Sequence, residues 1–361
     1  MKIKKIQTGL IKIPLVTPFK TALRTVENVE DLIVCVETDT GEKGYGEAPP
    51  TAVITGDTLG SIETAISEFI APALIGMEID NIDEIMGKLH RCILHNSSAK
   101  AAVDMAIYDL YAKSLNRPLY KVLGGARKEI ETDLTISVNP VQQMVKDSLS
   151  AIERGFSILK IKVGKEGEKD LERISEIRQA VGPEVRIRVD ANQGWTPKQA
   201  VKIIQRMEDK GLGIDLVEQP VKGIDFAGMQ FVTSHTATTI LADESVFSPL
   251  DAIRLFENNA ADMVNIKLMK TGGLYEAMKI CHIAETYGKE CMVGCMLESK
   301  IAVSAAAHLA AAKSVITAVD LDGPSLCSED PYIGGPIYEE SAIRMTDAPG
   351  IGITGVPVTF E

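Results

Sequence analysis

The chain has 361 residues, of which 45% are hydrophobic and 24% charged, values typical of a globular protein of one or two domains. Its net charge of −12 argues against nucleic acids and anionic membranes as partners. No apolar run is long enough to span a bilayer, and Lys12 and Pro14 interrupt any signal-peptide core, so we expect a cytoplasmic protein. The six cysteines include no CxxC pair and are expected to be reduced core residues.

The first 125 residues have the patterns of a small α+β unit. Strand patterns occupy residues 3–16, 32–38 and 44–48, with a turn at Asp39-Thr40-Gly41 between the last two. The spacing of one apolar helix face is followed by Ile62, Ala65, Ile66, Phe69 and Ile70. An Ala-rich segment over 98–115 predicts a longer helix, and Gly124-Gly125 marks the end of the unit.

From residue 126 onward, short apolar strands alternate with helical segments, the pattern of a parallel α/β sheet or barrel. Thr196-Pro197 and Ser248-Pro249 are typical helix starts. Eight strands are predicted, over residues 133–137, 158–162, 185–190, 214–218, 239–243, 262–267, 292–295 and 315–320. Eight strand–helix units indicate a closed barrel, whose active site would lie at the C-terminal ends of the strands.

Charged residues end five successive strands of this predicted barrel. They are Lys162, Asp190, Glu218, Asp243 and Lys267, separated by 28, 28, 25 and 24 residues, which is one strand–helix unit each time. Ending an apolar strand on a charge is costly unless the charge meets water, a partner or an ion. Five such ends in consecutive units would meet at one mouth, which favours a functional site over independent surface charges.

Three of these residues, Asp190, Glu218 and Asp243, are carboxylates on neighbouring strands. Carboxylate oxygens that leave positions for water and substrate suit Mg²⁺. The simpler alternative is that the acids only pair with lysines across the mouth. We favour the metal site, because three close acids repel one another strongly unless a cation lies between them.

Lysines flank the acids on both sides. Lys160 and Lys162 share one strand face because side chains alternate along a strand, and we expect each lysine to lower the pKa of the other. Such a shift suits a general base near neutral pH. Lys162 on the second strand and Lys267 on the sixth would stand on opposite sides of the ring. This arrangement predicts one base on each face of a substrate, as inversion of a carbon centre requires.

The motifs resemble the enolase superfamily in its muconate-lactonizing subgroup. The resemblance rests on an ordered set of segments: Lys160-Ile161-Lys162, Asp190-Ala191-Asn192, Glu218-Gln219-Pro220, Ala242-Asp243-Glu244-Ser245 and Asn265-Ile266-Lys267. It implies an α/β fold, a modified TIM barrel of the type (β/α)7β, with an N-terminal α+β capping domain that the C-terminal tail completes. The implied domains are residues 1–125, 126–322 and 323–361. It also implies a lysine base, Mg²⁺ and an ene-diolate.

Within the subgroup, the chain is most similar to dipeptide epimerases of the L-Ala-D/L-Glu type. The distinguishing segment is Asp320-Leu321-Asp322, which in that family binds the ammonium group of the dipeptide; a solvated loop or a helix cap is the alternative. Arg24 matches a lid arginine that meets an acidic substrate side chain, although a solvated lid charge fits it nearly as well. The resemblance also gives Thr135, Met296 and Glu298 contact with the substrate. We expect Asn192 to support the metal ligands and Glu244 to orient a neighbour, although a structural role fits both residues equally well.

The resemblance implies the following reaction. One Mg²⁺ per active site, held by the three carboxylates, binds the C-terminal carboxylate of a dipeptide. Lys162 or Lys267 removes the α-proton, and the opposite lysine returns a proton to the other face. Lys160 and the metal stabilise the charge of the ene-diolate. The protein would then be an isomerase with a small-molecule dipeptide as its partner, and the resemblance suggests a homo-oligomer.

Other functions remain open. o-Succinylbenzoate synthase, N-succinylamino acid racemase and muconate cycloisomerase share the lysines and the carboxylates, and Asp320 with Asp322 argues against them. Epimerases of hydrophobic or other dipeptides are also open, since Arg24 alone favours an acidic C-terminal residue. A metal-free lysine enzyme that forms a Schiff base and a non-catalytic binding protein are the alternatives from other classes.

Two features have no part in this reaction. The segment Lys270-Thr271-Gly272-Gly273 resembles a phosphate-binding loop but lacks its spacing, so we predict the start of a helix. Arg186 and Arg188 share parity with Asp190, which predicts that both arginines point into the barrel and pair with acids there. The pattern does not identify those acids.

Overall fold

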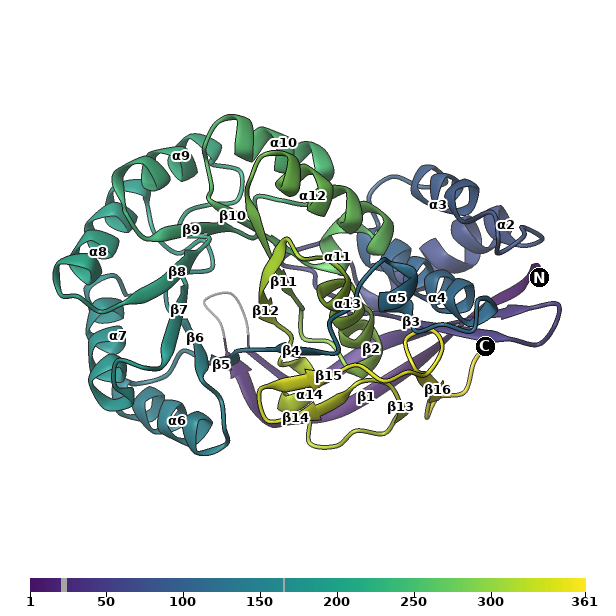
Figure 1. Ribbon diagram of the computed structural model, residues 1–361, viewed down its shortest axis with the longest axis horizontal. Helices are drawn as coiled ribbons and strands as arrows, with labels where there is room; N and C mark the ends of the chain where they lie inside the picture. The colour runs from purple at the N-terminus through teal and green to yellow at the C-terminus, as the bar shows by residue number, and fades with distance from the viewer. Residues whose placement is uncertain (21–24, 165) are drawn as a thin grey trace.

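A nearly closed barrel of eight parallel strands dominates the computed structural model, which describes residues 1–20, 25–164 and 166–361 (Figure 1). The strands follow one another around the sheet in chain order. They are β5 (Leu134–Ile136), β6 (Ile158–Lys162), β7 (Arg186–Asp190), β8 (Ile214–Glu218), β9 (Thr239–Ala242), β10 (Met263–Ile266), β11 (Glu290–Gly294) and β12 (Ile316–Asp320). Each lies within or close to a predicted strand.

Seven helices connect these strands and form the outer layer of the barrel (Figure 1). They are α6 (Val141–Glu153), α7 (Glu168–Val181), α8 (Pro197–Asp209), α9 (Phe226–His235), α10 (Pro249–Glu257), α12 (Leu274–Thr286) and α13 (Lys300–Ala312). Thr196 caps α8 and Ser248 caps α10, each by accepting a backbone N–H group with its side chain. The short α11 (Leu268–Thr271) precedes α12. The predicted (β/α)7β barrel is therefore confirmed.

The register of the strands places their charged ends side by side. Lys162 lies opposite Asp190, and Asp190 lies opposite Glu218. Glu218 lies opposite Leu241, so Asp243 comes directly after the end of β9. Because parallel strands present their carboxyl ends at one mouth, a regular spacing in the sequence becomes a cluster in space.

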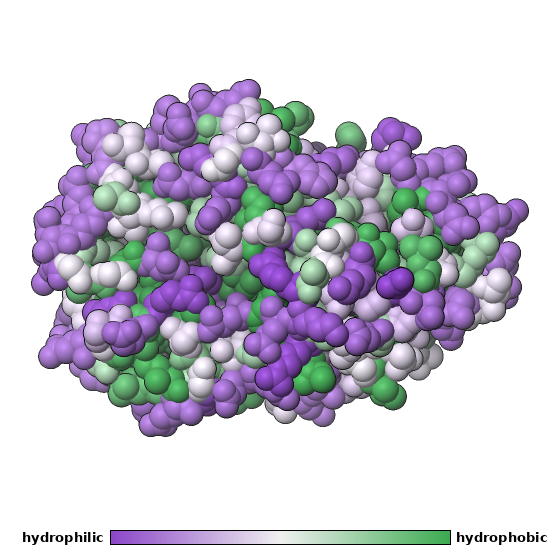
Figure 2. Space-filling view, in the orientation of Figure 1, coloured by the Kyte–Doolittle hydropathy of each residue, from purple (hydrophilic) through white to green (hydrophobic). Residues whose placement is uncertain are grey.

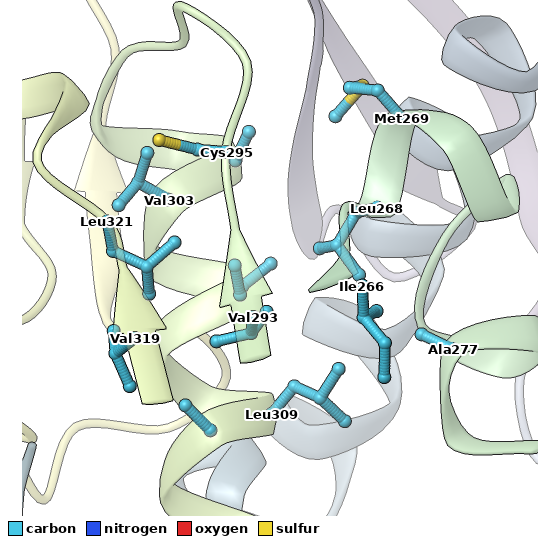
Figure 3. Close-up of a cluster of buried hydrophobic side chains, with 14 of the residues drawn as sticks. Ile266, Leu268, Met269, Ala277, Val293, Cys295, Val303, Leu309, Val319 and Leu321 are labelled. Atoms are coloured by element: carbon cyan, nitrogen blue, oxygen red, sulfur yellow. The ribbon is translucent and has the colours of Figure 1, made fainter. Parts of the chain in front are cut away.

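Apolar side chains between the sheet and the helices hold these strand ends in place. Val293 of β11 and Val319 of β12 lie on adjacent strands, with Leu309 of α13 below them and Ile266 of β10 beside them (Figure 3). All four are buried, and full burial of such a side chain contributes about 1.5–3 kcal/mol. This packing fixes the backbone from which the charged side chains project.

The N-terminal unit packs beside the barrel (Figure 1). Its antiparallel sheet consists of β1 (Ile3–Lys20), β2 (Thr25–Thr38) and β3 (Lys43–Ala48). Its helices are α1 (Leu59–Thr64), the π-helix η1 (Ala65–Ile70), α2 (Ala71–Leu74), α3 (Ile82–Arg91), α4 (Ser97–Ser114) and α5 (Leu119–Val122). The predicted hairpin and the long Ala-rich helix are both present.

One helix face was predicted wrongly. Phe69 was expected on the apolar face with Ile66 and Ile70, but its side chain is exposed. The segment forms a π-helix, in which Ala71 donates its N–H to the carbonyl of Ile66, five residues back. The wider turn rotates Phe69 away from the core.

The C-terminal segment returns to earlier parts of the chain. It contains α14 (Gly323–Leu326), β13 (Ile333–Gly334), β14 (Ile337–Glu339), β15 (Ala342–Arg344) and β16 (Ile353–Gly355). Strand β15 pairs with β4 (Glu129–Glu131), which lies just before the barrel. Thr8 and Glu361 exchange backbone hydrogen bonds, so the last residue lies against β1, and both termini lie at the same end of the molecule (Figure 1).

Buried acids of the N-terminal unit join it to the rest of the chain. Glu47 of β3 accepts two N–H groups at the start of α13, each at 2.8 Å. Asp104 of α4 accepts the first two N–H groups of α12, at 2.6 and 3.2 Å. Asp109 accepts N–H groups from β3 and from the C-terminal segment. We call these three residues the interface acids.

The two arginines of β7 differ from each other. Arg188 is buried and donates to Asp133 at 2.7 Å and to Asp215 at 3.2 Å, as expected of a side chain inside the barrel. Arg186 also has an acidic partner, Glu131, but it is exposed rather than enclosed. It is the first residue of the strand, where the barrel opens to solvent.

Polar side chains cover most of the face shown in Figure 2, with smaller apolar areas between them. Among the described residues, no helix has the length and apolar character that a membrane span requires.

Candidate active site

Buried charged side chains gather at the mouth of the barrel. Six carboxylates and four lysines there are at most 9% exposed: Asp190, Glu218, Asp243, Glu244, Asp320 and Asp322 with Lys160, Lys162, Lys267 and Lys270. We call this set the mouth cluster. A buried charge is stable only with a partner, so the contacts within the set determine what it can do.

Among the lysines of the cluster, Lys160 contacts the largest number of carboxylates. Its Nζ lies 2.6 Å from Glu218 Oε2, 2.7 Å from Asp320 Oδ2 and 3.2 Å from Asp190 Oδ2. Lys162 approaches the same oxygen of Asp190 at 2.6 Å. The two lysines therefore share one carboxylate oxygen, in keeping with the strand face that they share.

Lys267 lies on the other side of the barrel. It follows β10, four strands away from β6 in an eight-stranded sheet, and thus half-way around the ring. Its Nζ lies 2.8 Å from Asp243 Oδ2. Lys162 and Lys267 line one cavity together with Asp243. The geometry therefore brings two amines to one space from opposite sides.

The acids raise the pKa of the lysines. Burial alone would lower the pKa of Lys160, but Asp320, Glu218 and Asp190 outweigh burial and raise that pKa well above its ordinary value. We expected Lys160 and Lys162 to lower each other's pKa, and for Lys160 this expectation is wrong in direction. It neglected the carboxylates, which lie closer to Lys160 and act with the opposite sign.

The same balance holds for the second lysine and for the acids. Burial lowers the pKa of Lys267, and the attraction of Asp243 more than offsets that effect, so the pKa is raised. Burial raises the pKa of Asp190, while Lys162 and Lys160 bring it below its ordinary value. Glu218 has a raised pKa because of burial and of the neighbouring Asp190.

The carboxylates of the cluster outnumber its lysines, which suits a divalent cation among the acids. Four lysines against six carboxylates leave two negative charges when all are ionised. In the described part of the chain, no three acids, histidines or cysteines lie close enough to hold a metal ion, because ammonium groups stand between the carboxylates. The acids pair with the lysines as in the simpler alternative above, but the excess charge remains. Hard carboxylate oxygens with excess negative charge suit Mg²⁺.

Glu244 and Asn192 leave polar atoms without partners beside the same cavity. Neither carboxylate oxygen of Glu244 has a hydrogen-bond partner within the described residues, and burial, followed by Asp243 and Asp190, raises its pKa to about 8. We had expected Glu244 to orient a neighbouring residue, but within the described residues its side chain makes no hydrogen bond through which it could do so. The backbone N–H of Asn192 donates to Asp190 Oδ1 at 2.8 Å, while its side-chain Oδ1 has no partner there.

Asp320 and Asp322 lie at the end of β12 and line the same cavity. Asp322 Oδ2 accepts the backbone N–H of Thr135 at 2.7 Å, and burial together with Asp320 raises the pKa of Asp322 to about 6. Asp320 has a lowered pKa, since Lys160 outweighs the effect of burial. Two acids at a cavity wall form a site that can attract an ammonium group.

Apolar side chains make up much of the remaining cavity wall. This apolar wall consists of Phe19, Val53, Ile54, Cys295, Met296, Leu297 and Leu326. Glu298 accepts the backbone N–H of Met296 at 2.7 Å, and burial raises its pKa to about 8. Arg24 lies outside the described residues.

Three residues with a supporting position were missed by the sequence analysis. Asn265 donates to Glu218 Oε1 at 2.8 Å. Gln219, at a positive φ of 37°, accepts the N–H groups of Asp243 and Ser245 and so fixes the turn after β9. Lys270 contacts Asp243. Asn265 and Gln219 stand inside motifs that we had quoted, and this position next to the charged strand ends is the signal that could have identified them.

Comparison with known proteins places the chain in a family. Residues 6–124 match the model "Mandelate racemase / muconate lactonizing enzyme, N-terminal domain", and residues 143–356 match "Enolase C-terminal domain-like". The chain belongs to the mandelate racemase/muconate lactonizing enzyme family. This membership confirms the resemblance to the enolase superfamily.

Several members of this family are similar over their whole length. The chain is 52% identical over 356 residues to the L-Ala-D/L-Glu epimerase of Clostridium acetobutylicum. The matching region covers 99% of each protein. It is 44% identical to the hydrophobic dipeptide epimerase of Enterococcus faecalis, over 98% of this chain and 100% of that protein. The relatives of this chain in the mandelate racemase/muconate lactonizing enzyme family thus include dipeptide epimerases that are named for different substrates.

Solved structures of the family agree with this. The substrate-liganded L-Ala-D/L-Glu epimerase from Bacillus subtilis has a TM-score of 0.98 at 49% identity and covers 99% of this chain and 100% of its own. The Enterococcus faecalis dipeptide epimerase complexed with Mg and L-Leu-L-Tyr has a TM-score of 0.95 at 43% identity, over 98% and 100% of the two chains.

Proposed function

We propose that this protein is a Mg²⁺-dependent dipeptide epimerase, an isomerase that inverts the α-carbon of the C-terminal residue. The observation that carries the proposal is the position of Lys162 and Lys267, which reach one cavity from opposite sides of the barrel. The relatives that are 52% and 50% identical are both named L-Ala-D/L-Glu epimerase, which supports this substrate type.

Each charged group has a role in the proposed reaction. Asp190, Glu218 and Asp243 would hold one Mg²⁺ per active site, which supplies positive charge to the substrate carboxylate as the neighbouring carbon is deprotonated. One of the two opposed lysines accepts the α-proton on its Nζ. The other lysine donates a proton from its Nζ to the opposite face of the same carbon, so the proton count balances.

A lysine must be neutral to accept the proton. The acids of the mouth cluster favour the charged form of Lys267. This attraction is weaker when the same acids are shared with a cation, so we expect the base and the bound metal to depend on each other. Lys160 stays charged among its three carboxylates and adds a fixed positive charge beside the reacting carboxylate.

The acids at the end of β12 give the substrate its orientation. We propose that Asp320 and Asp322 bind the N-terminal ammonium group of the dipeptide, with the loop beside Thr135 held by Asp322. Met296 contributes to the wall of the cavity, and Glu298 acts through the backbone of Met296. The carboxylate of Glu244 and the amide oxygen of Asn192 face this space as further acceptors.

The side-chain preference divides into two candidates. An acidic C-terminal residue is our first choice, on the resemblance of Arg24 to a lid arginine and on the names of the most similar relatives. The apolar wall around Phe19, Val53 and Ile54 favours hydrophobic dipeptides as the second candidate, in line with the Enterococcus faecalis relative. The ratio of kcat/KM for L-Ala-L-Glu and L-Ala-L-Leu decides between the two.

Isotope exchange tests the proposed reaction. The purified protein with Mg²⁺ is incubated in D₂O with L-Ala-L-Glu and with L-Ala-D-Glu, and the products are separated and weighed by mass spectrometry. We expect inversion together with one deuterium at the α-carbon of the Glu residue. Inversion that persists in EDTA, or products trapped on the protein by borohydride, would instead indicate a metal-free Schiff-base enzyme.

We also propose that the enzyme is cytoplasmic and homo-oligomeric. All six cysteines are free, which agrees with a reducing compartment. Analytical ultracentrifugation measures the oligomeric state, and a monomer at micromolar concentration would contradict this part of the proposal.

A further inference from the structure

The segment Lys270-Thr271-Gly272-Gly273 has no part in the reaction proposed above, yet it contains a fully buried lysine. The side chain of Lys270 is 0% exposed. Its Nζ donates to Asp243 Oδ1 at 2.5 Å, to the backbone carbonyl of Asp243 at 2.5 Å and to the backbone carbonyl of Asn265 at 3.0 Å. An ammonium group has three N–H donors, so these contacts use all of them.

The local backbone explains how Lys270 reaches this position. Strand β10 ends at Ile266, and the short α11 follows at once. Gly272, at φ 81°, and Gly273, at φ 115°, end this turn in conformations that other residues rarely adopt. Lys270 lies inside α11 and reaches Asp243 at the start of the loop after β9, whereas Lys267, which precedes α11, lines the cavity.

Asp243 is thus held from two sides. Lys270 takes Oδ1, and Lys267, which lines the cavity, lies 2.8 Å from Oδ2. Gln219 fixes the backbone of the same residue by accepting its N–H at 2.8 Å. Rotation of the carboxylate about its χ2 angle would break the bond to Lys270, so only Oδ2 is left to face the cavity in a defined direction.

We propose that Lys270 is a positioning residue that sets the carboxylate of Asp243 for metal binding. This inference rests on the proposed role of Asp243 as a metal ligand. Lys270 is buried and is not among the residues that line the cavity, so it acts through Asp243 and through the link that it makes between the ends of β9 and β10. The segment resembles a phosphate-binding loop in sequence, but its lysine holds Asp243 rather than a phosphate.

The sign of one substitution separates positioning from simple charge balance. Lys270→Met removes a positive charge and so makes the mouth cluster more negative, from −2 to −3 when all groups are ionised. Coulomb's law alone then predicts tighter binding of a cation. Loss of orientation predicts weaker binding, since a free carboxylate must be ordered before it can coordinate. Weaker binding of a cation by Lys270→Met can therefore not result from the change in net charge.

Direct binding of Mn²⁺, a spectroscopic substitute for Mg²⁺, measures this without any turnover. Metal-free protein is titrated with Mn²⁺, and the free ion is followed by electron paramagnetic resonance. We expect the dissociation constant of Lys270→Met to be at least about tenfold higher than that of the parent protein. A folded variant that binds Mn²⁺ as tightly as the parent, or more tightly, would overturn the proposal.

Lys100 offers a matched control. It is another buried lysine, packed on α4 against the same turn, and its Nζ donates to the backbone carbonyl of His90 at 3.2 Å. Lys100→Met therefore makes the same chemical change beside α11 without touching Asp243. We expect its Mn²⁺ affinity to stay within about twofold of the parent. An equal loss in both variants would show that any disturbance of this turn matters, and would reject a specific role of Lys270.

Two further measurements keep the outcome interpretable. Circular dichroism and a thermal melt verify that the variants fold.

Should Lys270→Met fail to fold, Lys270→Arg takes its place: it keeps the charge, but its planar head group cannot occupy one point between three oxygens. Weaker Mn²⁺ binding by this variant supports positioning, and equal binding rejects it. Failure of the parent itself to bind Mn²⁺, or equal binding by Asp243→Asn, would reject the proposed metal site instead.

Discussion

The protein buries carboxylates in two regions and partners them in different ways. The interface acids Glu47, Asp104 and Asp109 each accept two backbone N–H groups from other parts of the chain, and Asp109 also pairs with Lys113. The acids of the mouth cluster lie mainly against lysine side chains and beside a cavity. Fixed amide dipoles hold a carboxylate in one orientation, whereas a carboxylate that is paired with a flexible ammonium group can exchange this partner for another cation.

The difference teaches how to distinguish structural from functional buried charge. At the interface, Glu47 has both oxygens satisfied by two N–H groups. At the mouth, Glu244 has neither oxygen satisfied within the described residues, and acids outnumber lysines. Substitutions in the first region should therefore act on stability, and substitutions in the second region on metal binding and turnover. Four predictions test this division, beginning with the largest effects.

The first prediction concerns the opposed lysines. Lys162→Ala and Lys267→Ala should each reduce epimerisation by at least about 10²–10⁴-fold, because each removes one of the two proton-transfer groups. Each change also removes a buried ammonium partner of Asp190 or Asp243, so the thermal midpoint should fall unless Mg²⁺ takes that place, and the rates are compared at a temperature at which both variants are folded. Polarimetry or chiral chromatography measures the rate, and near-normal turnover by Lys162→Ala would reject its role.

Metal removal should have an effect on turnover at least as large as that of the lysine substitutions. EDTA should abolish turnover, and Mg²⁺ should restore it. Mg²⁺ at 100 times its dissociation constant should also stabilise the folded protein by about 2.7 kcal/mol, since it binds the native state alone. Differential scanning calorimetry measures the shift, and Asp243→Asn serves as the control that should lose most of it. An equal rise of the midpoint in that variant would place the binding elsewhere.

Glu47→Gln should destabilise the protein by about 1–3 kcal/mol, because the amide can accept only one of the two buried N–H groups. Glu37→Gln on the neighbouring β2 is the control: Glu37 pairs with exposed Lys4 and Lys5, and such pairs contribute about 0–1 kcal/mol. Urea denaturation measures both. Similar losses for the two variants would show that the link to α13 contributes little.

The last prediction concerns Asp104 and the dependence of stability on pH. Burial raises the pKa of Asp104 to about 8, far above its ordinary value. The folded state then binds more protons than the unfolded state between about pH 4 and pH 8, so this residue makes stability fall as the pH rises through that window. Asp104→Asn should remove that part of the dependence. Unfolding free energies of both proteins at pH 5 and pH 9 test it, and an unchanged pH slope would contradict the raised pKa.

The barrel and the set of charged residues at its mouth could be predicted from the sequence because both depend on local patterns. A buried parallel strand appears as a short apolar run, and a charge at its end is visible at once, as with Asp190 and Glu218. The spacing between such ends then equals one strand–helix unit. The pairing of β15 with β4 has no local signal, and the resemblance implied only that the C-terminal tail completes the capping domain.

The errors concern properties that depend on several elements together. Phe69 was assigned to the wrong face because a π-turn has no clear signature in one sequence. The pKa of Lys160 was predicted from its nearest sequence neighbour, whereas acids from β7, β8 and β12 determine it in space. Lys270 was missed because its partners, Asp243 and the carbonyl of Asn265, lie at the ends of two neighbouring strands, and a single sequence does not show that the short helix α11 brings its side chain there.

The central claim is that the two lysines serve opposite faces of one α-carbon. Stereospecific exchange by the single-lysine variants tests it most directly: Lys162→Ala and Lys267→Ala are each given L-Ala-L-Glu and L-Ala-D-Glu in D₂O with Mg²⁺. We predict that each variant exchanges the α-proton of only one epimer, and that the two variants choose opposite epimers. Exchange of both epimers by either variant would contradict the account.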